Sequence, residues 1–541
     1  MKKQTIIIAL VSVLILSLLL LSWRFYRASP IQSQSGITNT MGGTSMMNAN
    51  GAPAQHYPAS NSSSLESRAG TTPTTLVNLT NGATYSMTVS EVNDTIDGKV
   101  LPMLAYNDSI PGPTIQVQQD STVHIQLTNN LHMATTLHPH GLRTTNAFDG
   151  VPDVTQKPIQ PGETFTYDLT FPDPGVYWYH PHLREDITQN LGLAGNFLVT
   201  PKDTAYWNPV EHEWTALLND MFIDANHPKL TANDTQVDNA LMGTYGNTLL
   251  VNGEANYKWE AKQGERARFY ITNASNVRPY NLDLDGLKMK LVGSDNGKYE
   301  QETWQDHIVL SPGERAIIET YFDISGTFAF THQTPDKTYQ LATIHVLSNT
   351  VEPTKKQAFE QLHGNPDTTA SIDPFRSSFN KPNDKTLRLT MDMPGHSMMG
   401  GGMMQDISAD GIEWEDTMSS MNSMMSDMAQ WRIVDETTGK KNADVQWQFK
   451  QGDKVKIKIT NDKTSMHPMQ HPIHLHGQRF LVLTENGTAN TNLVWKDTVL
   501  VPAGDTVEIL VDMSNPGTWM LHCHISEHAE NGMMSSFTVK P

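Results

Sequence analysis

The sequence predicts an all-β protein made of three consecutive Greek-key β-sandwich domains. A segment in which apolar and polar residues alternate around a turn occurs three times, at residues 115–129, 259–273 and 447–461. Such alternation is typical of half-buried hairpins. A chain of 541 residues is too long for a single core, and its 36 glycines and 30 prolines suit many short strands joined by turns.

A second block follows each copy of the first, and it consists of a turn and then a strand rich in aromatic or apolar residues. The turns are Pro161-Gly162-Glu163, Pro312-Gly313-Glu314 and 502–505, and the strands follow at 175–180, 326–331 and 517–522. Two blocks repeated in the same order indicate three similar β units.

The repeats and the changes in composition predict the domain boundaries. We expect an apolar amino-terminal segment at residues 1–27 and a disordered linker at 28–72. The first domain follows at 73–203 and the second at 204–350. A second linker at 351–380 leads to the third domain at 381–541. The first linker is rich in Ser, Thr, Asn, Gly and Gln, a composition that forms no packed core.

The amino-terminal segment contains an uncharged apolar run at residues 6–23, flanked by Lys2, Lys3, Arg24 and Arg27. The run has about the length that spans a bilayer. An uncleaved membrane anchor is favoured over a secretory signal, because no convincing small-residue cleavage site follows. Under either alternative we expect the body of the protein outside the cytoplasm, anchored to the cell membrane or secreted.

Composition narrows the functional classes further. The formal charge of −19 argues against nucleic-acid binding, which needs a basic patch. Cys523 is the only cysteine, so the chain has no internal disulfide. We expect a monomer.

Cys523 lies in the most informative stretch, His522-Cys523-His524 followed by His528 and Met533. A thiolate, imidazoles and a weak thioether are the ligands of a blue-copper electron-transfer site. Three more histidine clusters lie upstream, at His138-Pro139-His140, His180-Pro181-His182 and His471-Pro472-Ile473-His474-Leu475-His476.

Strand geometry sorts these residues into two groups. Successive side chains of an extended strand point to opposite faces, so Cys523 faces away from His522 and His524. By the same rule His471 faces away from His474 and His476. One group, around one copper ion, is therefore His471, Cys523, His528 and Met533. The other, around a larger centre, is His138, His140, His180, His182, His474, His476, His522 and His524.

The middle unit serves as an internal comparison. It has Asp283-Leu284-Asp285-Gly286 where the first unit has its first histidine pair, and Thr331-His332-Gln333 where the third has His522-Cys523-His524. Because the repeat persists there without the ligand pattern, the fold does not require these histidines.

With these motifs and spacings, residues 73–541 resemble three-domain multicopper oxidases of the laccase and copper-efflux-oxidase type. The resemblance implies three cupredoxin-like domains and four copper ions, one of type 1, one of type 2 and two of type 3. It implies type 1 ligands at His471, Cys523 and His528, with Met533 axial. It also implies type 2 ligands at His138 and His474, and type 3 ligands in two sets, His140, His180 and His524, and His182, His476 and His522.

The same resemblance implies carboxylates that supply protons to the larger centre. Asp149 matches one acid of the family, eleven residues after His138. The second acid of relatives directly follows the type 1 histidine, where this chain has Ala529. Glu527 and Glu530 are the neighbouring alternatives.

A methionine-rich tract at residues 391–428 indicates the reducing substrate. It contains eleven methionines among Gly, Ser and Asp, with no regular helical spacing. Thioethers are soft ligands that prefer Cu(I), and copper-efflux oxidases carry such an insert. Met469 matches a substrate-binding methionine of those relatives, and His467 replaces an aspartate. The candidate substrate ligands are Met469, His467, Met391, Met393, Met398, Met399, Met403 and Met404.

The resemblance therefore implies an oxidase that couples four one-electron oxidations to the reduction of O₂ to two waters, and the methionine-rich tract favours Cu(I) as its substrate, in copper tolerance. A laccase-type phenol oxidase is the first alternative, and a copper-sequestering protein is the second. Fe(II) and Mn(II) remain open as reductants.

Overall fold

The computed structural model describes residues 68–541 except for 224–236, 238, 350–352, 394–407 and 427. The predicted membrane segment and almost all of the first linker lie outside the described residues. Within the described part of the chain, no helix has the length and apolar character needed to cross a membrane. The linker predicted for residues 28–72 ends early, because Ala69 and Gly70 already pair with β3 as the short strand β1.

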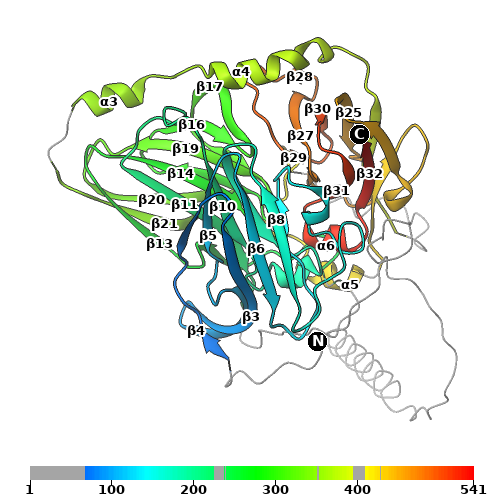
Figure 1. The fold of residues 1–541 in the computed structure, drawn as a ribbon, viewed down its shortest axis with the longest axis horizontal. Coiled ribbons are helices and arrows are strands. Elements are labelled where there is room, and N and C mark those ends of the chain that lie inside the picture. Colours follow the sequence, from blue (N-terminus) through cyan, green and yellow to red (C-terminus); the bar gives the residue numbers. More distant parts are fainter. Residues whose placement is uncertain (1–67, 224–236, 238, 350–352, 394–407, 427) are drawn as a thin grey trace, which may run out of the picture. The chain divides into compact units, whose positions relative to one another are not determined.

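The first sandwich consists of two sheets of five strands (Figure 1). One contains β1 (Ala69–Gly70), β3 (Thr84–Ile96), β6 (Thr122–Asn129) and β8 (Thr164–Thr170) in this order, with β4 (Lys99–Tyr106) paired to β3. The other has the order β2 (Leu76–Leu79), β5 (Thr114–Gln118), β10 (Gly195–Thr200), β9 (Gly175–His180) and β7 (His138–His140).

The second sandwich repeats this plan. Its larger sheet has the order β12 (Thr248–Val251), β11 (His212–Met221), β14 (Arg266–Asn273), β19 (Arg315–Tyr321), β16 (Met289–Ser294) and β17 (Gly297–Gln305). Its smaller sheet has the order β13 (Tyr257–Lys262), β21 (Thr338–Leu347), β20 (Gly326–Gln333), β15 (Tyr280–Leu284) and β18 (Ile308–Leu310).

The third sandwich has the same topology as the second. Its larger sheet has the order β23 (Gln430–Asp435), β22 (Lys385–Asp392), β25 (Asp453–Asn461), β30 (Thr506–Met513), β27 (Arg479–Glu485) and β28 (Thr488–Ala489). Its smaller sheet has the order β24 (Gln446–Lys450), β32 (Met534–Lys540), β31 (Gly517–Cys523), β26 (His471–Leu475) and β29 (Thr498–Val501). The prediction of three consecutive all-β sandwiches is confirmed.

Helices are short and lie outside the sheets. Among the described residues they are α2 (Glu185–Thr188), α3 (Pro353–Glu360), α4 (Pro366–Ile372), α5 (Ser419–Met425) and α6 (Ser526–Glu530), with short 3-10 helices at Asn146–Phe148, Asp373–Ser378 and Asn442–Asp444. The predicted linker between the second and third domains contains α3 and α4, which follow the upper edge of the molecule in Figure 1. Ile372 and Phe375 pack against Leu481 and Trp495 of the third domain, so this part of the linker is anchored by apolar contacts.

Each sandwich encloses its own apolar core between its two sheets. In β6 the burial alternates strictly along the strand, as expected for a strand with one face in the core. The core positions therefore account for the apolar half of the alternating pattern that the sequence shows three times.

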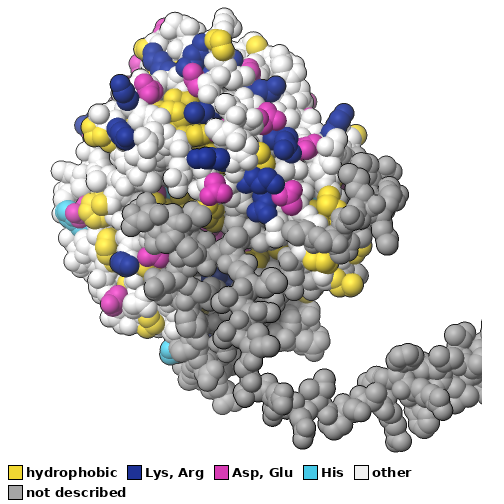
Figure 2. Space-filling model, turned by 90° about the vertical axis from the view of Figure 1, so that its right-hand side faces the viewer, with side chains coloured by type: hydrophobic (Ala, Val, Ile, Leu, Met, Phe, Trp, Pro, Cys, Tyr) yellow, Lys and Arg dark blue, Asp and Glu magenta, His cyan; other side chains and the backbone are white. Residues whose placement is uncertain are grey.

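The surface carries charges of both signs. On the face shown in Figure 2, Lys and Arg side chains are interspersed with Asp and Glu.

Candidate metal centres

Neighbouring strands bring the predicted ligands together. In the first domain β7 pairs with β9 so that His138 lies opposite His180. In the third domain β26 pairs with β31, which places His474 opposite His522 and Ile473 opposite Cys523. In the second domain the corresponding strands β15 and β20 pair Asp283 with Thr331. The same strand pair thus carries ligands in the outer domains and none of the predicted ligands in the middle one.

One metal group lies inside the third domain. Potential ligand atoms of His471, Cys523 and His528 all lie within 4.8 Å of one another. The Cys523 Sγ atom is 3.5 Å from His471 Nδ1 and 3.8 Å from His528 Nδ1. Met533 is buried in the same core, and its carbonyl accepts a hydrogen bond from the Cys523 backbone N–H at 3.1 Å. These four residues are the ones that strand parity assigned to one copper ion.

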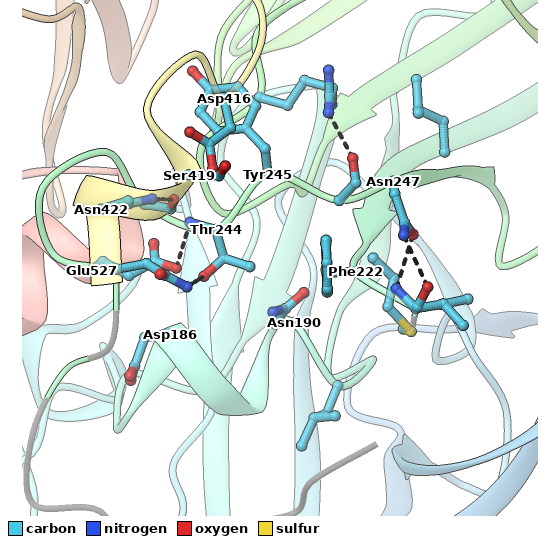
Figure 3. Close-up of a pocket in the computed structure, with 18 of the residues that line it drawn as sticks. Asp186, Asn190, Phe222, Thr244, Tyr245, Asn247, Asp416, Ser419, Asn422 and Glu527 are labelled. Carbon is cyan, nitrogen blue, oxygen red and sulfur yellow. Dashed lines mark hydrogen bonds between the residues drawn. The ribbon is translucent and has the colours of Figure 1, made fainter. Parts of the chain in front are cut away.

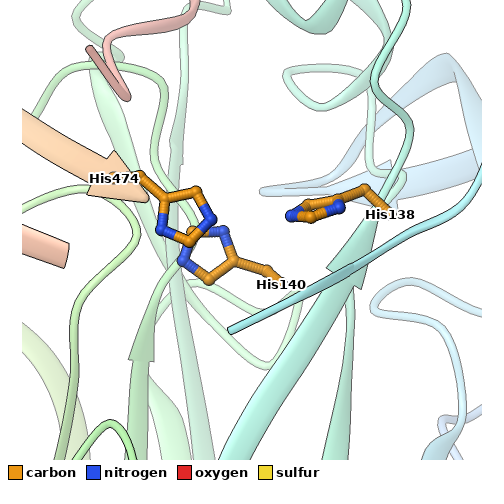
Figure 4. A group of neighbouring side chains, drawn as sticks. All are labelled: His138, His140 and His474. Atoms are coloured by element: carbon orange, nitrogen blue, oxygen red, sulfur yellow. The ribbon is translucent and has the colours of Figure 1, made fainter. Parts of the chain in front are cut away.

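A larger group of eight histidines lies between the first and third domains. Its imidazoles form three triplets whose ligand atoms are close enough for a common ion: His138, His140 and His474; His140, His180 and His524; and His182, His476 and His522. Figure 4 shows the first triplet, in which the His140 and His474 rings are stacked at 3.8 Å with His138 beside them. The other two triplets have the membership that the resemblance implies for the type 3 pair.

The imidazole nitrogens fit a metal cluster. Protein oxygens accept hydrogen bonds from the Nδ1 atoms of His138, His180, His474, His476 and His522, at distances between 2.6 and 3.0 Å. A ring that donates from Nδ1 presents the lone pair of Nε2. Within the described residues, the Nε2 atoms of His138, His180, His182 and His474 have no hydrogen-bond partner. These buried nitrogens accept no hydrogen bond from any described residue, and their lone pairs can instead bind a metal ion.

The pKa values also suit metal binding. Burial, and next the other imidazoles, hold the pKa values of His140, His182, His474 and His476 well below the ordinary range. These rings are therefore neutral near pH 7, as metal ligands must be. Burial has the opposite effect on the Cys523 thiol, whose pKa it raises. A cation at the sulfur reverses this preference, because a coordinating thiol is deprotonated.

Asp149 links the first domain to the third at this centre. Its carboxylate accepts a hydrogen bond from His476 Nδ1 at 3.0 Å, and its backbone carbonyl accepts one from His138 Nδ1 at 2.6 Å. The predicted proton-supplying acid is therefore in contact with two of the predicted ligands. Contacts of this kind fix the orientation of a ligating ring.

A second buried carboxylate, Asp497, supports the opposite side of the cluster. Its Oδ1 atom is 3.2 Å from His140 Nε2, and its carbonyl accepts a hydrogen bond from His474 Nδ1 at 2.9 Å. Arg315 of the middle domain binds this carboxylate through both terminal nitrogens, at 2.6 and 2.5 Å, and both side chains are fully buried. Neither Arg315 nor Asp497 was predicted from the sequence, because no spacing of residues along the chain indicates a contact between domains.

Three acidic side chains lie near the other end of the cluster, and they differ in their contacts. Glu185 approaches a ligand directly, with Oε1 3.0 Å from His182 Nδ1. Glu530 accepts a hydrogen bond from the Glu185 backbone N–H at 3.1 Å, and Glu527 accepts one from the Thr244 backbone N–H at 2.8 Å. Burial raises the pKa values of Glu527 and Glu530 to about 7. Glu527 and Glu530 were expected here from the sequence, and Glu185 was not.

A pocket of about 750 Å³ adjoins this acidic region. Its lining comes from all three domains and includes Ile187, Phe222, Arg278, Asn422 and Glu527. In Figure 3 the Glu527 carboxylate lies beside Thr244, with Asp186 on the adjacent wall. The pocket therefore reaches the residue that precedes His528 in the chain.

The methionine-rich tract is only partly an irregular insert. Met391 lies in the strand β22, which ends at Asp392, and Met393 follows the strand, with both methionine side chains in the core of the third domain. Their assignment as substrate ligands stays a prediction, and the structure places both in the same core as Met469, Cys523 and Met533. The signal was present, because Leu387, Leu389, Met391 and Met393 alternate with polar residues as in any half-buried strand.

The rest of the tract divides into two parts. Met398, Met399, Met403 and Met404 lie outside the described residues. Residues Ser419–Met425 form the helix α5, although the spacing of the methionines did not indicate a helix. Met424 on this helix is 78% exposed, whereas Met425 packs into the core. Helix α5 therefore presents at least one thioether to solvent.

The two remaining candidate substrate ligands are buried near the Cys523 group. Met469 is fully buried in the core that contains Cys523. His467 is 4% exposed, and its Nε2 atom has no hydrogen-bond partner among the described residues. Its ring centroid lies 6.2 Å from that of Trp431, which itself lies 4.1 Å from the His528 ring. His467 is thus separated from His528 by one aromatic side chain.

Comparisons with known proteins agree with this arrangement. Three sequence models of the multicopper oxidase family match residues 75–204, 212–350 and 413–541. The multicopper oxidase mco of Staphylococcus haemolyticus is 26% identical over 443 residues, which cover 81% of this chain and 83% of that protein. The iron transport multicopper oxidase FET3 of Gibberella zeae is 24% identical over 471 residues, covering 81% and 73%.

Among solved structures, a laccase from Pediococcus acidilactici is 25% identical with a TM-score of 0.66, and the match covers 91% of this chain and 95% of that one. The three matched segments together span most of the sequence. The chain belongs to the multicopper oxidase family, and its domains have the cupredoxin-like fold that the sequence predicted.

The middle domain touches the cluster through a glycine, which gives a prediction. Gly313 has φ +84°, and a Cβ atom there would lie 2.9 Å from His524 Cδ2. Gly313→Ala should therefore displace the His524 ring in addition to the backbone cost of about 1–2 kcal/mol. We expect weaker copper retention, measured as copper bound per chain after dialysis against a chelator.

The equivalent turn of the first domain supplies a matched control. Gly162 has φ +82°, and a Cβ atom there would meet no atom within 4 Å. Gly162→Ala should show a similar backbone cost in thermal unfolding but unchanged copper retention. Equal copper retention in both variants would contradict a role for the middle domain in shaping the cluster.

Proposed function

We propose that this protein oxidises a reducing substrate in four one-electron steps and reduces O₂ to two waters, with one type 1, one type 2 and two type 3 copper ions. The observation that carries the proposal is the position of Cys523. It belongs to the single-ion group, while its neighbours His522 and His524 belong to two different triplets of the histidine cluster. The two groups are thus joined by one peptide bond on each side.

Copper bound at these residues supplies the one-electron redox chemistry that protein side chains lack. The chain's own contributions follow from the contacts described above. His471, Cys523 and His528 hold the electron-accepting site, and the backbone of 522–524 connects it to the cluster. Asp149 holds His476 in its orientation and lies where a proton is needed during reduction of O₂. The full burial of the cluster histidines excludes bulk water from the reaction.

Cu(I) is the proposed substrate, in a role in copper tolerance. The reaction balances as four Cu(I), one O₂ and four protons giving four Cu(II) and two waters. Support comes from the soft thioethers of the methionine-rich tract and from the buried, unpartnered Nε2 atom of His467 near the Cys523 group. His471 and His528 are fully buried, which disfavours direct contact with a bulky organic reductant.

The test compares two reductants in the same preparation. Met398, Met399, Met403 and Met404 are all replaced by leucine, which keeps their approximate volume and removes the sulfur. We expect kcat/KM for Cu(I) to fall by about tenfold or more, the scale on which loss of a metal-site residue acts. The rate with a bulky phenol, however low in the unmodified protein, should not change, and this comparison serves as the internal control.

His467→Ala is tested in parallel, because the histidine is described by the structure and the four methionines are not. A selective loss of Cu(I) turnover in either variant supports cuprous oxidation. If both variants oxidise Cu(I) as fast as the unmodified protein, the methionine tract is a passive insert and this substrate assignment fails.

Phenol oxidation is the second candidate function. The pocket of about 750 Å³ favours it, since it has the size of a small-molecule site and includes Glu527, the neighbour of His528. A phenol that binds there should show weaker turnover in Glu527→Gln, measured as KM and kcat separately. Fe(II) is a third possible reductant, because one relative is an iron transport oxidase.

We further propose that the protein acts outside the cytoplasm as a monomer, held by the apolar run at residues 6–23 or released after cleavage. The support for this placement is the length of that run and its flanking basic residues. Fractionation of cells into membrane and soluble extracytoplasmic material distinguishes the anchored form from the secreted one.

A further inference from the structure

His182 is held differently from most rings of the histidine cluster. Backbone carbonyls accept from Nδ1 of His138, His180, His474 and His522, and Asp149 accepts from His476. Among the described residues, neither ring nitrogen of His182 has a hydrogen-bond partner of good geometry. The oxygen that lies within reach of its Nδ1 atom is Glu185 Oε1, at 3.0 Å.

Glu185 is built into the interface between the first and third domains. It is 1% exposed and begins the helix α2, three residues after His182. Its backbone N–H donates to Glu530 Oε1 on α6, the helix that follows Cys523 and His524. Its second carboxylate oxygen, Oε2, lies 4.0 Å from His180 Nδ1. The carboxylate thus stands beside one member of each triplet implied for the type 3 pair.

This location agrees with a gap in the third domain. The resemblance implies an acidic residue directly after the type 1 histidine, which is His528 here. This chain has Ala529 at that position, and Ala529 packs among Val151, Met520 and Met534. Glu530 and Glu527 accept hydrogen bonds from the backbone N–H groups of Glu185 and Thr244, which are not cluster histidines. Within the described part of the chain, the carboxylate at this end of the cluster that touches a ligand comes from the first domain.

We propose that Glu185 is the positioning residue for His182, accepting from its Nδ1–H so that Nε2 is presented to the type 3 copper. This inference rests on the copper assignment of the proposed function. The physical basis is general: a ligating imidazole keeps its orientation and basicity through an acceptor at its other nitrogen. Without Glu185, the His182 ring is free to rotate about its side-chain bonds within the limits of its packing.

The test compares Glu185→Ala, Glu185→Gln and Asp186→Asn. Asp186 is the matched control, because it is the next residue of α2, is also largely buried, and pairs with Arg184 instead of a histidine. Each purified full-length protein is loaded with copper and titrated with a chelator, and copper bound per chain is measured together with the electron paramagnetic resonance spectrum.

Glu185→Ala should hold its cluster copper about 10- to 100-fold more weakly, which is the usual effect of losing such an acceptor. The spectrum should gain a signal from copper that is no longer coupled to its partner ion, while the visible absorption of the Cys523 site stays unchanged. Glu185→Gln should lose less, because its amide oxygen still accepts from Nδ1–H. Asp186→Asn should bind copper like the unmodified protein.

Two outcomes overturn the inference, and they are distinguishable. If Glu185→Ala binds as much copper as Asp186→Asn and has the same spectrum, Glu185 does not position His182. The copper assignment then still stands. If the unmodified protein itself shows no coupled copper pair, the proposed cluster fails and the inference with it. Circular dichroism of the copper-free variants excludes misfolding as the cause of a loss.

Discussion

Cys523→Ser is expected to abolish oxidation of every reductant while leaving the histidine cluster able to bind copper. The thiol lies 3.5 Å from His471 Nδ1 and 3.8 Å from His528 Nδ1, and a serine hydroxyl cannot replace a soft thiolate ligand there. The intense visible absorption of a thiolate–copper bond should disappear, and copper bound per chain should fall by one ion. Oxygen consumption and metal analysis measure the two effects.

Met533→Leu is the control for this result. Its side chain is fully buried in the core with Cys523, so leucine is accommodated at nearly equal volume. An axial thioether is a weak ligand that tunes the reduction potential. Met533→Leu should therefore keep the absorption and the turnover, with a shifted potential. Substantial turnover by Cys523→Ser would show that electrons enter elsewhere, for example directly at the histidines.

Arg315→Met is expected to destabilise the copper-free protein by about 3–5 kcal/mol, because it leaves a buried carboxylate without its partner. Arg315 makes two short contacts to Asp497, and both side chains are fully buried between the second and third domains. Asp497 in turn supports His140 and His474, so copper retention should fall as well. Denaturant unfolding of the copper-free chain and copper analysis measure the two losses.

The double variant Arg315→Met with Asp497→Asn separates the two causes. Because it removes the unpaired charge, it should be more stable than Arg315→Met alone. Lys356→Met, which breaks the exposed pair with Asp323, should leave stability nearly unchanged. A small effect of Arg315→Met, similar to that of Lys356→Met, would contradict a structural role for the buried pair.

The sequence predicted the parts of the site that depend on local geometry. The period of two along a strand separates Cys523 from His522 and His524, and it does so whatever the rest of the chain does. The same period predicted the three sandwiches, because each repeat alternates apolar residues, which face a core, with polar residues, which face away from it. The structure places the two ligand groups as the parity argument sorted them.

The sequence did not predict the residues that act across domain interfaces. Arg315 binds Asp497 of the third domain, and Asp497 in turn reaches His140 of the first, and no local spacing encodes such contacts. Glu185 is a different case, because it follows its partner His182 by only three residues and its contact was still not predicted. The burial of Met391 and Met393 in the core of the third domain was also not predicted. The alternating pattern of strand β22 includes Met391 and continues to Met393, the residue after the strand, and it indicates two buried side chains.

The pairing of His140 with His524 joins residues 384 positions apart, and this separation bears on how the protein matures. A ribosome must synthesise both outer domains before the whole cluster exists, and the His471, Cys523 and His528 group also waits for the third domain, which is made last. Chains that lack the third domain therefore carry only four of the eight cluster histidines, His138, His140, His180 and His182. Copper insertion into the cluster is necessarily a late event in the life of each molecule.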